Sequence, residues 1–301
     1  MSETNNNNKK TYRGNCHCAA IVYEITLAEI KKVTECNCSI CVKKGTIYVW
    51  PDADADEIKY VKGDPSVLTE YTFNEGKFTH KFCPTCGTSV MITGHVKPGK
   101  EGEERKLDSG FNVRTFQHGQ VDLWTIDRQL FDGKSLPPAH KEPEYNGPEP
   151  TGEVEGGKLY TGSCHCGAVT VAAKLKPIDA NFQPVNDCNC SSCGRYGGLW
   201  TYPPKPQVVV QGKENFTRYV FGKRLAGKCF CKICGVLILN DIAKLSEEEV
   251  SKFDKATLDW YQGAHELAPI NLRVLHGIDV KELKPNQFDG YAFIQPQYVE
   301  P

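Results

Sequence analysis

The sequence predicts a mostly β protein built from two tandem copies of one small zinc-binding domain. Three observations carry this prediction. A set of five short motifs occurs twice, in the same order, along the 301 residues. The 15 cysteines fall mainly in C-x-C and C-x-x-C spacings, which are typical of metal sites. Short runs of β-branched and aromatic residues, separated by Gly and Pro, favour strands over helices.

The repeat is visible in the order of the motifs. Because five markers return in the second half without changing their order, we expect two copies of one domain. The matching segments are G-x-C-H-C (14–18 and 162–166), C-N-C-S-x-C (36–41 and 188–193), F-C-x-x-C-G (82–87 and 230–235), Asn-x-Arg (112–114 and 271–273) and Phe-Asp-Gly (131–133 and 288–290).

Composition places the domain limits around these motifs. Residues 134–158 are rich in Pro, Glu and Gly, which predicts an extended linker with little core of its own. Residues 1–10 are polar and Asn-rich, and we expect a disordered tail there. The first domain should therefore span 11–133 and the second 159–295. A chain of this length can give each domain its own hydrophobic core.

The strand and helix signals follow the same division. The second copy departs from the first at residues 246–264, where Ser246 followed by Glu249 is a capping-box pattern that opens a helix. We therefore expect a helical insertion in the second domain. Elsewhere β-branched or alternating runs predict strands at 20–25, 45–50, 168–171 and 208–210.

Charge and hydropathy exclude several classes of partner. The formal net charge is −1, so no general attraction to nucleic acid or to an anionic membrane is expected. No apolar run approaches the length of a membrane-spanning helix, and the polar N-terminus lacks the apolar stretch of a secretory signal. We expect a cytoplasmic protein, which could also enter the nucleus, without membrane or nucleic-acid partners.

Two motifs in each copy supply four cysteines that are spaced for one closed metal site. In a strand, residues i and i+2 point to the same face, so a C-x-C pair delivers two thiolates side by side. A C-x-x-C followed by Gly is a zinc knuckle, a tight turn that needs the backbone freedom of Gly87 or Gly235. Two plus two makes a tetrahedral four-thiolate site that joins distant segments, so metal binding would contribute to folding. The predicted ligands are Cys16, Cys18, Cys83 and Cys86 in the first copy, and Cys164, Cys166, Cys231 and Cys234 in the second.

The C-x-C-x-x-C cluster differs because it supplies only three ligands, all from one short loop. Once the closed site is filled, the first copy has no cysteine left to complete the cluster. Three protein ligands and one vacancy are typical of a catalytic or substrate-binding zinc, whereas a His, Asp or Glu from elsewhere would close the site. Up to four Zn²⁺ ions per chain follow, two in each domain. The three-cysteine clusters are Cys36, Cys38 and Cys41, and Cys188, Cys190 and Cys193.

Three thiolates also predict the chemistry of such a site. They make the zinc a weakly Lewis-acidic centre that favours a soft fourth ligand. An incoming thiol would lose its proton on binding and be held as a thiolate. The cluster therefore suits the capture of a thiol, or the making and breaking of a carbon–sulfur bond, better than the activation of water.

The order G-x-C-H-C, C-x-C-S-x-C and F-C-x-x-C-G resembles the glutathione-dependent formaldehyde-activating enzyme family, which includes the centromere protein V branch. The resemblance covers both copies and implies small antiparallel sheets around a structural zinc. It implies that the four-cysteine sets hold the structural zinc and that the three-cysteine clusters hold a catalytic zinc. The implied activity is that of a carbon–sulfur lyase, which adds glutathione reversibly to formaldehyde and gives S-hydroxymethylglutathione. The centromere protein V branch suggests the alternative, a non-catalytic scaffold that zinc stabilises.

Residues inside and beside the motifs carry further expectations. His17 and His165 stand between two ligands and should point away from the metal. Cys229 lies outside the shared ligand set and should be a partly buried free thiol, the alternative being that it closes a metal site in the second domain. Asn37 and Asn189 separate the first two cysteines of the three-cysteine clusters, where the family often has His.

Basic residues near the three-cysteine clusters are candidates for substrate contacts. Lys43 and Lys44 follow the first cluster and could hold an anionic thiol adduct. Arg195 follows the second cluster, and its planar charged group suits a carboxylate. Arg114 and Arg273 either bind a carboxylate of the substrate or pair with a neighbouring Asp. The Gly-rich segment 194–198 is a slim loop, which favours the second cluster as the more open site.

Overall fold

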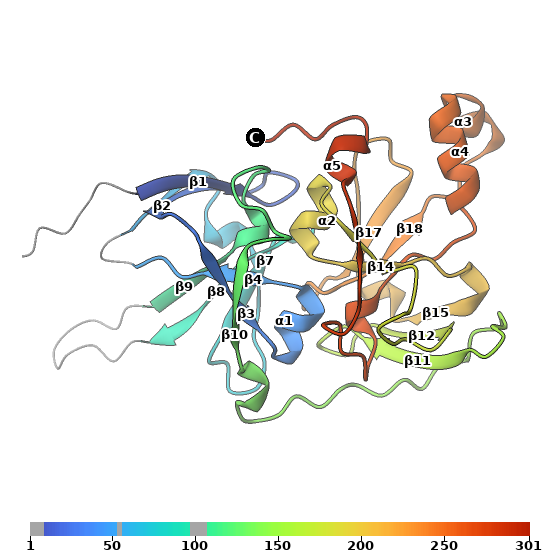
Figure 1. The fold of residues 1–301 in the computed structure, drawn as a ribbon, viewed down its shortest axis with the longest axis horizontal. Coiled ribbons are helices and arrows are strands. Elements are labelled where there is room, and N and C mark those ends of the chain that lie inside the picture. The colour runs from blue at the N-terminus through green and yellow to red at the C-terminus, as the bar shows by residue number, and fades with distance from the viewer. Residues whose placement is uncertain (1–8, 53–55, 97–106) are drawn as a thin grey trace, which may run out of the picture. The chain divides into compact units, whose positions relative to one another are not determined.

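The structure is mostly β. The computed structural model describes residues 9–52, 56–96 and 107–301. In these residues the strands form four sheets, two of three strands and two of seven, and the helices are short (Figure 1). The predicted fold class, two similar β-rich halves with few helices, is confirmed.

The chain divides into two compact units whose limits differ from those of the sequence repeats. Unit 1 contains residues 1–140 together with 191–197 and 299–301, and unit 2 contains residues 141–190 and 198–298. The short helix α2 (Ser191–Tyr196) is encoded in the second copy but belongs to unit 1. Unit 1 therefore combines the whole first copy with two short segments of the second half.

The small sheet of unit 1 positions the first pair of cysteines. Its three strands are antiparallel, in the order β1, β2, β5, and Tyr23 and Ile25 on β2 are fully buried. Cys16 and Cys18 lie in the turn that joins β1 to β2. The strands are β1 (Lys9–Asn15), β2 (Val22–Ala28) and β5 (Glu57–Lys62).

The large sheet of unit 1 carries the other cysteine motifs. All neighbouring strands are antiparallel except β10 and β3, which run parallel. Helix α1 (Ser39–Lys44) follows β3 and ends at Gly45, whose φ of 59° is the left-handed value that glycine adopts easily. In spatial order the strands are β10 (Asp127–Phe131), β3 (Lys32–Cys36), β4 (Ile47–Val49), β9 (Leu107–Asn112), β8 (Ser89–Val96), β7 (Thr79–Phe82) and β6 (Thr69–Tyr71).

Unit 2 repeats this arrangement strand for strand. Its small sheet has the order β11, β12, β15, and its large sheet contains one parallel pair, β20 and β13. The small-sheet strands are β11 (Lys158–Ser163), β12 (Thr170–Leu175) and β15 (Val208–Gln211). In spatial order the large-sheet strands are β20 (Asn286–Phe288), β13 (Asn186–Cys188), β14 (Leu199–Thr201), β19 (Ile270–Asn271), β18 (Leu237–Ile242), β17 (Ala226–Cys231) and β16 (Phe216–Val220).

The predicted helical insertion of the second copy is confirmed as two helices, α3 (Glu247–Ser251) and α4 (Lys255–Ala264). The Ser246 side chain accepts from the backbone N–H of Glu249, and the Glu249 side chain accepts from the backbone N–H of Ser246, so the capping box forms. The helix does not run on unbroken because Asp254 caps a second start, accepting from Thr257 N at 2.7 Å.

The segment between the two repeats contains little regular structure. Strand β1 begins at Lys9, so the last two residues of the predicted tail are strand, and residues 1–8 lie outside the described residues. After the 3₁₀ turn at Gly133–Ser135, residues 136–157 run without helix or strand as far as β11. In unit 2 helix α5 (Gly290–Phe293) takes the place of that turn.

The turn that carries the first two cysteines contains a strained residue, directly after the second cysteine, in one copy only. Ala19 has φ 57°, whereas Gly167 occupies the same place in unit 2 with φ 78°. A side chain in the left-handed region costs about 1 kcal/mol. Ala19→Gly should therefore raise the free energy of unfolding of unit 1 by about 0.5–1 kcal/mol. Gly167→Ala should lower that of unit 2 by about 1 kcal/mol or more, since the added Cβ would also lie 3.0 Å from Pro143 Cγ.

Urea unfolding of the zinc-loaded chain measures both changes. Stabilisation by Ala19→Gly together with destabilisation by Gly167→Ala is the expected pattern, and two changes of the same sign would contradict it.

Candidate metal centres

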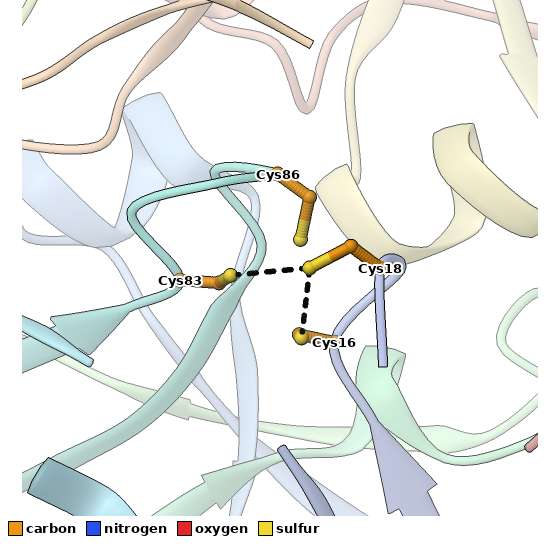
Figure 2. A group of neighbouring side chains, drawn as sticks. All are labelled: Cys16, Cys18, Cys83 and Cys86. Carbon is orange, nitrogen blue, oxygen red and sulfur yellow. Dashed lines mark hydrogen bonds between the residues drawn. The ribbon is translucent and has the colours of Figure 1, made fainter. Parts of the chain in front are cut away.

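Four cysteines of unit 1 converge on one point. Cys16 and Cys18 come from the β1–β2 turn, and Cys83 and Cys86 come from the turn between β7 and β8 (Figure 2). Cys18 Sγ lies 3.7 Å from Cys16 Sγ and 3.5 Å from Cys83 Sγ. All four sulfurs lie within 4.8 Å of one another. Gly87, with φ 73°, donates to Cys83 O at 2.8 Å and closes the knuckle turn.

Unit 2 builds the same group from the corresponding turns. Cys166 Sγ lies 3.5 Å from Cys164 Sγ and 3.7 Å from Cys231 Sγ. Cys234 completes the set within the same 4.8 Å. Gly235, with φ 72°, donates to Cys231 O at 2.8 Å, as Gly87 does in unit 1.

These distances fit a tetrahedral zinc ion. A Zn–S distance of about 2.3 Å places the sulfurs of a tetrahedron about 3.8 Å apart, close to the spacings in both groups. Cys16 and Cys164 are fully buried, and so are both knuckle cysteines in each unit. Only Cys18 and Cys166 are partly exposed, and a largely buried four-thiolate group suits a structural ion. The prediction that the C-x-C pairs lie on strands is wrong, because both pairs lie in turns.

The sulfurs of each four-cysteine group are within hydrogen-bond distance of one another. The hydrogen bond with Cys18 raises the pKa of the Cys16 thiol, and the same contact lowers the pKa of Cys18. Cys164 and Cys166 repeat this pattern. A thiolate surrounded by thiols is an arrangement that releases its remaining protons when a cation binds.

The three-cysteine clusters are assembled locally. In unit 1 Cys36 is the last residue of β3, Cys38 is the N-cap of α1, and Cys41 lies within α1. The three sulfurs lie within 4.8 Å of one another, and Cys38 N donates to Cys36 Sγ at 3.4 Å. The second cluster has the same layout: Cys188 ends β13, Cys190 immediately precedes α2, and Cys193 lies within α2.

Each of these clusters contains three ligands. Among the described residues, no fourth Cys, His, Asp or Glu joins either group. Hydrogen bonds with Cys38 and Cys41 lower the pKa of Cys36 to about 3, whereas the hydrogen bond with Cys36 raises the pKa of Cys38 to about 11. The three-ligand geometry thus favours the open alternative over the closed one.

The Phe-Asp-Gly motif lies against each three-cysteine cluster, a role that the sequence did not reveal. Strand β10 pairs in parallel with β3, which places Phe131 beside Cys36. Strand β20 pairs in the same way with β13, which places Phe288 beside Cys188. The only signal in the sequence was that the motif recurs.

The basic residues predicted to contact substrate make contacts within the protein instead. Lys43 and Lys44 are buried, and Lys44 Nζ lies 4.9 Å from the centre of the Phe82 ring. Arg114 is buried and donates to Gly45 O at 2.6 Å. These contacts fix the end of helix α1.

Arg195 does meet a carboxylate, but one from its own chain. It is buried, donates to Asn15 O at 3.1 Å and forms an ion pair with Glu300 at 2.6 Å. The expectation that the second cluster is the more open one is also wrong. Cys36 and Cys38 are half-buried, whereas all three cysteines of the second cluster are buried.

The residues expected to lie outside the metal groups do so. His17 Nε2 hydrogen-bonds Ser191 Oγ at 3.0 Å, and neither His17 nor His165 joins a cysteine group. Cys229 is buried and belongs to none of the groups, and burial raises the pKa of its thiol to about 12.

Comparison with known proteins agrees with the cysteine geometry. The profile described as "glutathione-dependent formaldehyde-activating enzyme" matches residues 11–110 and 159–272. The chain belongs to this family. Both matched segments contain one four-cysteine group and one three-cysteine cluster, and both end before the Phe-Asp-Gly motif of their copy, at 131–133 and 288–290.

A solved structure is also similar. It is a Rhodobacter sphaeroides protein from a structural genomics programme, 26% identical, and the match covers 42% of this chain and 98% of that one with a TM-score of 0.33. In the part of the chain that the structure describes, no helix has the length and apolar character needed to cross a membrane.

The four groups predict the metal content. Purified protein should contain more than two zinc ions per chain, with four as the upper limit set by the four groups. A chelator should remove the ions in two phases because three thiolates hold an ion less tightly than four. Elemental analysis and chelator kinetics measure both, and fewer than two tightly held ions would contradict the four-thiolate sites.

The two kinds of group should respond differently to substitution. Cys83→Ser removes a ligand that joins distant turns, so unit 1 should lose its folded structure, and Cys231→Ser should do the same in unit 2. Cys38→Ser and Cys190→Ser should leave the protein folded, since their clusters are local. Circular dichroism and thermal unfolding decide this, and equal damage from both kinds of variant would argue against an open site.

Proposed function

We propose that the protein is a zinc-dependent carbon–sulfur lyase-type enzyme that acts on a thiol adduct. The candidate reaction is the addition of glutathione to formaldehyde, which gives S-hydroxymethylglutathione. One observation carries the proposal: a chain of this family contains, twice, a cluster of three cysteines that no fourth Cys, His, Asp or Glu joins among the described residues.

The cysteines take two roles in this proposal. The four-cysteine groups hold structural zinc, and the three-cysteine clusters hold the zinc at which substrate binds. Such an ion supplies a soft, weakly Lewis-acidic centre with one open position, which suits a sulfur ligand. In the reaction the S–H bond of the thiol and the π bond of the carbonyl break, the sulfur forms a bond to the carbonyl carbon, and the proton ends on the carbonyl oxygen.

The residues of the chain prepare the cluster for this reaction. The end of β3 and the start of α1 hold the three sulfurs together, and the backbone N–H of Cys38 donates to Cys36 Sγ. The partial exposure of Cys36 and Cys38 leaves the unit 1 cluster accessible to a small-molecule thiol. We therefore expect the first cluster to contribute more to turnover than the second.

The cysteine chemistry also supports a compartment. All 15 cysteines are free thiols, and 14 of them stand in groups suited to metal. Such groups persist where thiols stay reduced, so we place the activity in the cytoplasm.

The test is a turnover assay with the full-length, zinc-loaded chain. S-Hydroxymethylglutathione should form faster than in a mixture of glutathione and formaldehyde alone, as followed by exchange NMR. A double variant, Cys38→Ser with Cys190→Ser, should return the rate to the uncatalysed value, because both clusters lose a ligand. Cys229→Ser is the matched control, since this cysteine belongs to none of the groups.

The outcome that counts against the proposal is equally direct. If the zinc-loaded chain neither accelerates the reaction nor binds glutathione by calorimetry, the clusters do not serve this chemistry.

A further inference from the structure

Each Phe-Asp-Gly segment attaches to the loop that carries the three-cysteine cluster. The parallel pairing of β10 with β3 is extended by a hydrogen bond from Asn37 N to Phe131 O at 3.1 Å. In unit 2 the equivalent bond from Asn189 N to Phe288 O is 3.2 Å long. The backbone between the first two cysteines of each cluster is thus continuous with this pairing.

The asparagine side chains hold the same segment from the other side. In unit 1 Asn37 Nδ2 donates to Asp132 Oδ1 at 2.7 Å, and Asn37 Oδ1 accepts from Lys134 N at 2.8 Å. In unit 2 Asn189 Nδ2 donates to Asp289 Oδ1 at 2.8 Å. Asn189 Oδ1 accepts from Tyr291 N at 2.9 Å. Both amide atoms of each asparagine are therefore bound to the Asp-Gly pair or to the residue directly after it.

The glycine of the motif lies directly against the cluster. A Cβ placed on Gly133 would be 2.5 Å from Cys36 Sγ, and one placed on Gly290 would be 2.5 Å from Cys188 Sγ. Neither glycine has a left-handed φ. Their backbone conformation therefore admits alanine, and the sulfur is what excludes a side chain.

We propose that the Asp-Gly pair of each motif, Asp132-Gly133 and Asp289-Gly290, is the positioning element of the open metal site. The pair fixes the first sulfur of the cluster and the loop that follows it, and so determines how well the three thiolates fit one ion. This inference rests on the proposed function only in assuming that the clusters hold a metal.

Magnitudes favour positioning over a purely structural role. Asp132 and Asp289 are exposed, and a single exposed hydrogen bond adds only about 1 kcal/mol or less to stability. Metal sites are far more sensitive, since ligand distances are held within about 0.2 Å. A Cβ at 2.5 Å would push the sulfur to a contact distance of about 3.5 Å, a shift of roughly 1 Å. Substitutions that disturb the support of a metal ligand weaken binding by roughly 10–100-fold.

The experiment measures metal affinity at one open cluster in the full-length chain. Cys38→Ser with Cys41→Ser disables the first cluster and defines the reference protein, in which Cys188, Cys190 and Cys193 form the only intact three-cysteine group among the described residues. Competition with a chromophoric chelator gives the zinc affinity of that group, and the thiolate-to-cobalt absorption of the Co²⁺ form reports its geometry.

Three variants of the reference protein test the proposal. Gly290→Ala should weaken zinc binding at the open cluster by at least about tenfold and alter the cobalt spectrum. Asp289→Ala should also weaken it, by about tenfold. Asp289→Asn should restore the affinity, because its amide oxygen still accepts from Asn189 Nδ2 and still caps α5 through Ala292 N.

Gly263→Ala is the matched control. Gly263 lies in α4 with nothing within 4 Å of an added Cβ, so its substitution should leave both zinc affinity and spectrum unchanged. The thermal unfolding of all variants, with the four-cysteine groups loaded, should stay close to that of the reference. If Gly290→Ala lowers the folded fraction, the comparison of Asp289→Ala with Asp289→Asn decides the question.

Two results would overturn the inference, and they are distinguishable. A third zinc ion held equally tightly by the reference, Gly290→Ala and Asp289→Ala proteins would overturn the positioning role and leave the proposed function standing. Failure of the reference protein to bind any zinc beyond its two four-cysteine ions would overturn both.

Discussion

The convergence of four thiolates from distant turns is the constraint on which each unit depends. Cys18 and Cys83 stand 65 positions apart in the sequence, yet their sulfurs are 3.5 Å apart in a largely buried site. Buried like charges at this distance repel strongly unless a cation neutralises them. The small sheet and the large sheet each contribute one turn to this group, so the group is one link between the two sheets of each unit.

The three-cysteine clusters differ because each is built from one short segment. Their ligands come from a single stretch of six residues, so the loop brings the sulfurs together without joining distant parts of the fold. A short loop of this kind has many conformations, and only a few of them aim three sulfurs at one point. The restraint must come from outside the loop. In each copy this restraint comes from a parallel strand, β10 or β20, which is the last strand of that copy along the chain.

Much of this could be predicted from the sequence because cysteine spacing is a strong local signal. The repeat, the β-rich class, the capping box at Ser246 and the membership of each four-cysteine group all follow from motifs that can be read directly. The turn location of Cys16 and Cys18 could not be predicted, since a C-x-C pair converges equally well in a strand and in a tight turn.

The contacts of the basic residues could likewise not be predicted from the sequence. A charged side chain beside a candidate site suggests a ligand, and only the fold shows that Lys44 lies over Phe82 or that Arg195 pairs with Glu300. The role of the Phe-Asp-Gly motif could not be predicted for a related reason. The motif carries no chemistry of its own, and its importance lies in a strand pairing between segments that are distant in sequence.

Unit 1 is assembled from distant segments of the chain, and this affects its folding during synthesis. This unit includes residues 191–197 and 299–301, which leave the ribosome after the rest of it has been synthesised. At translation rates of about 5–20 residues per second, the gap between residues 140 and 191 corresponds to roughly 3–10 s. For that interval the nascent first copy lacks helix α2, and with it the contacts that Ser191 and Arg195 make to His17 and Asn15. Unit 1 is thus complete only after part of the second half has been synthesised. A ribosome that stalls in the linker would leave unit 1 incomplete and exposed to chaperones and proteases.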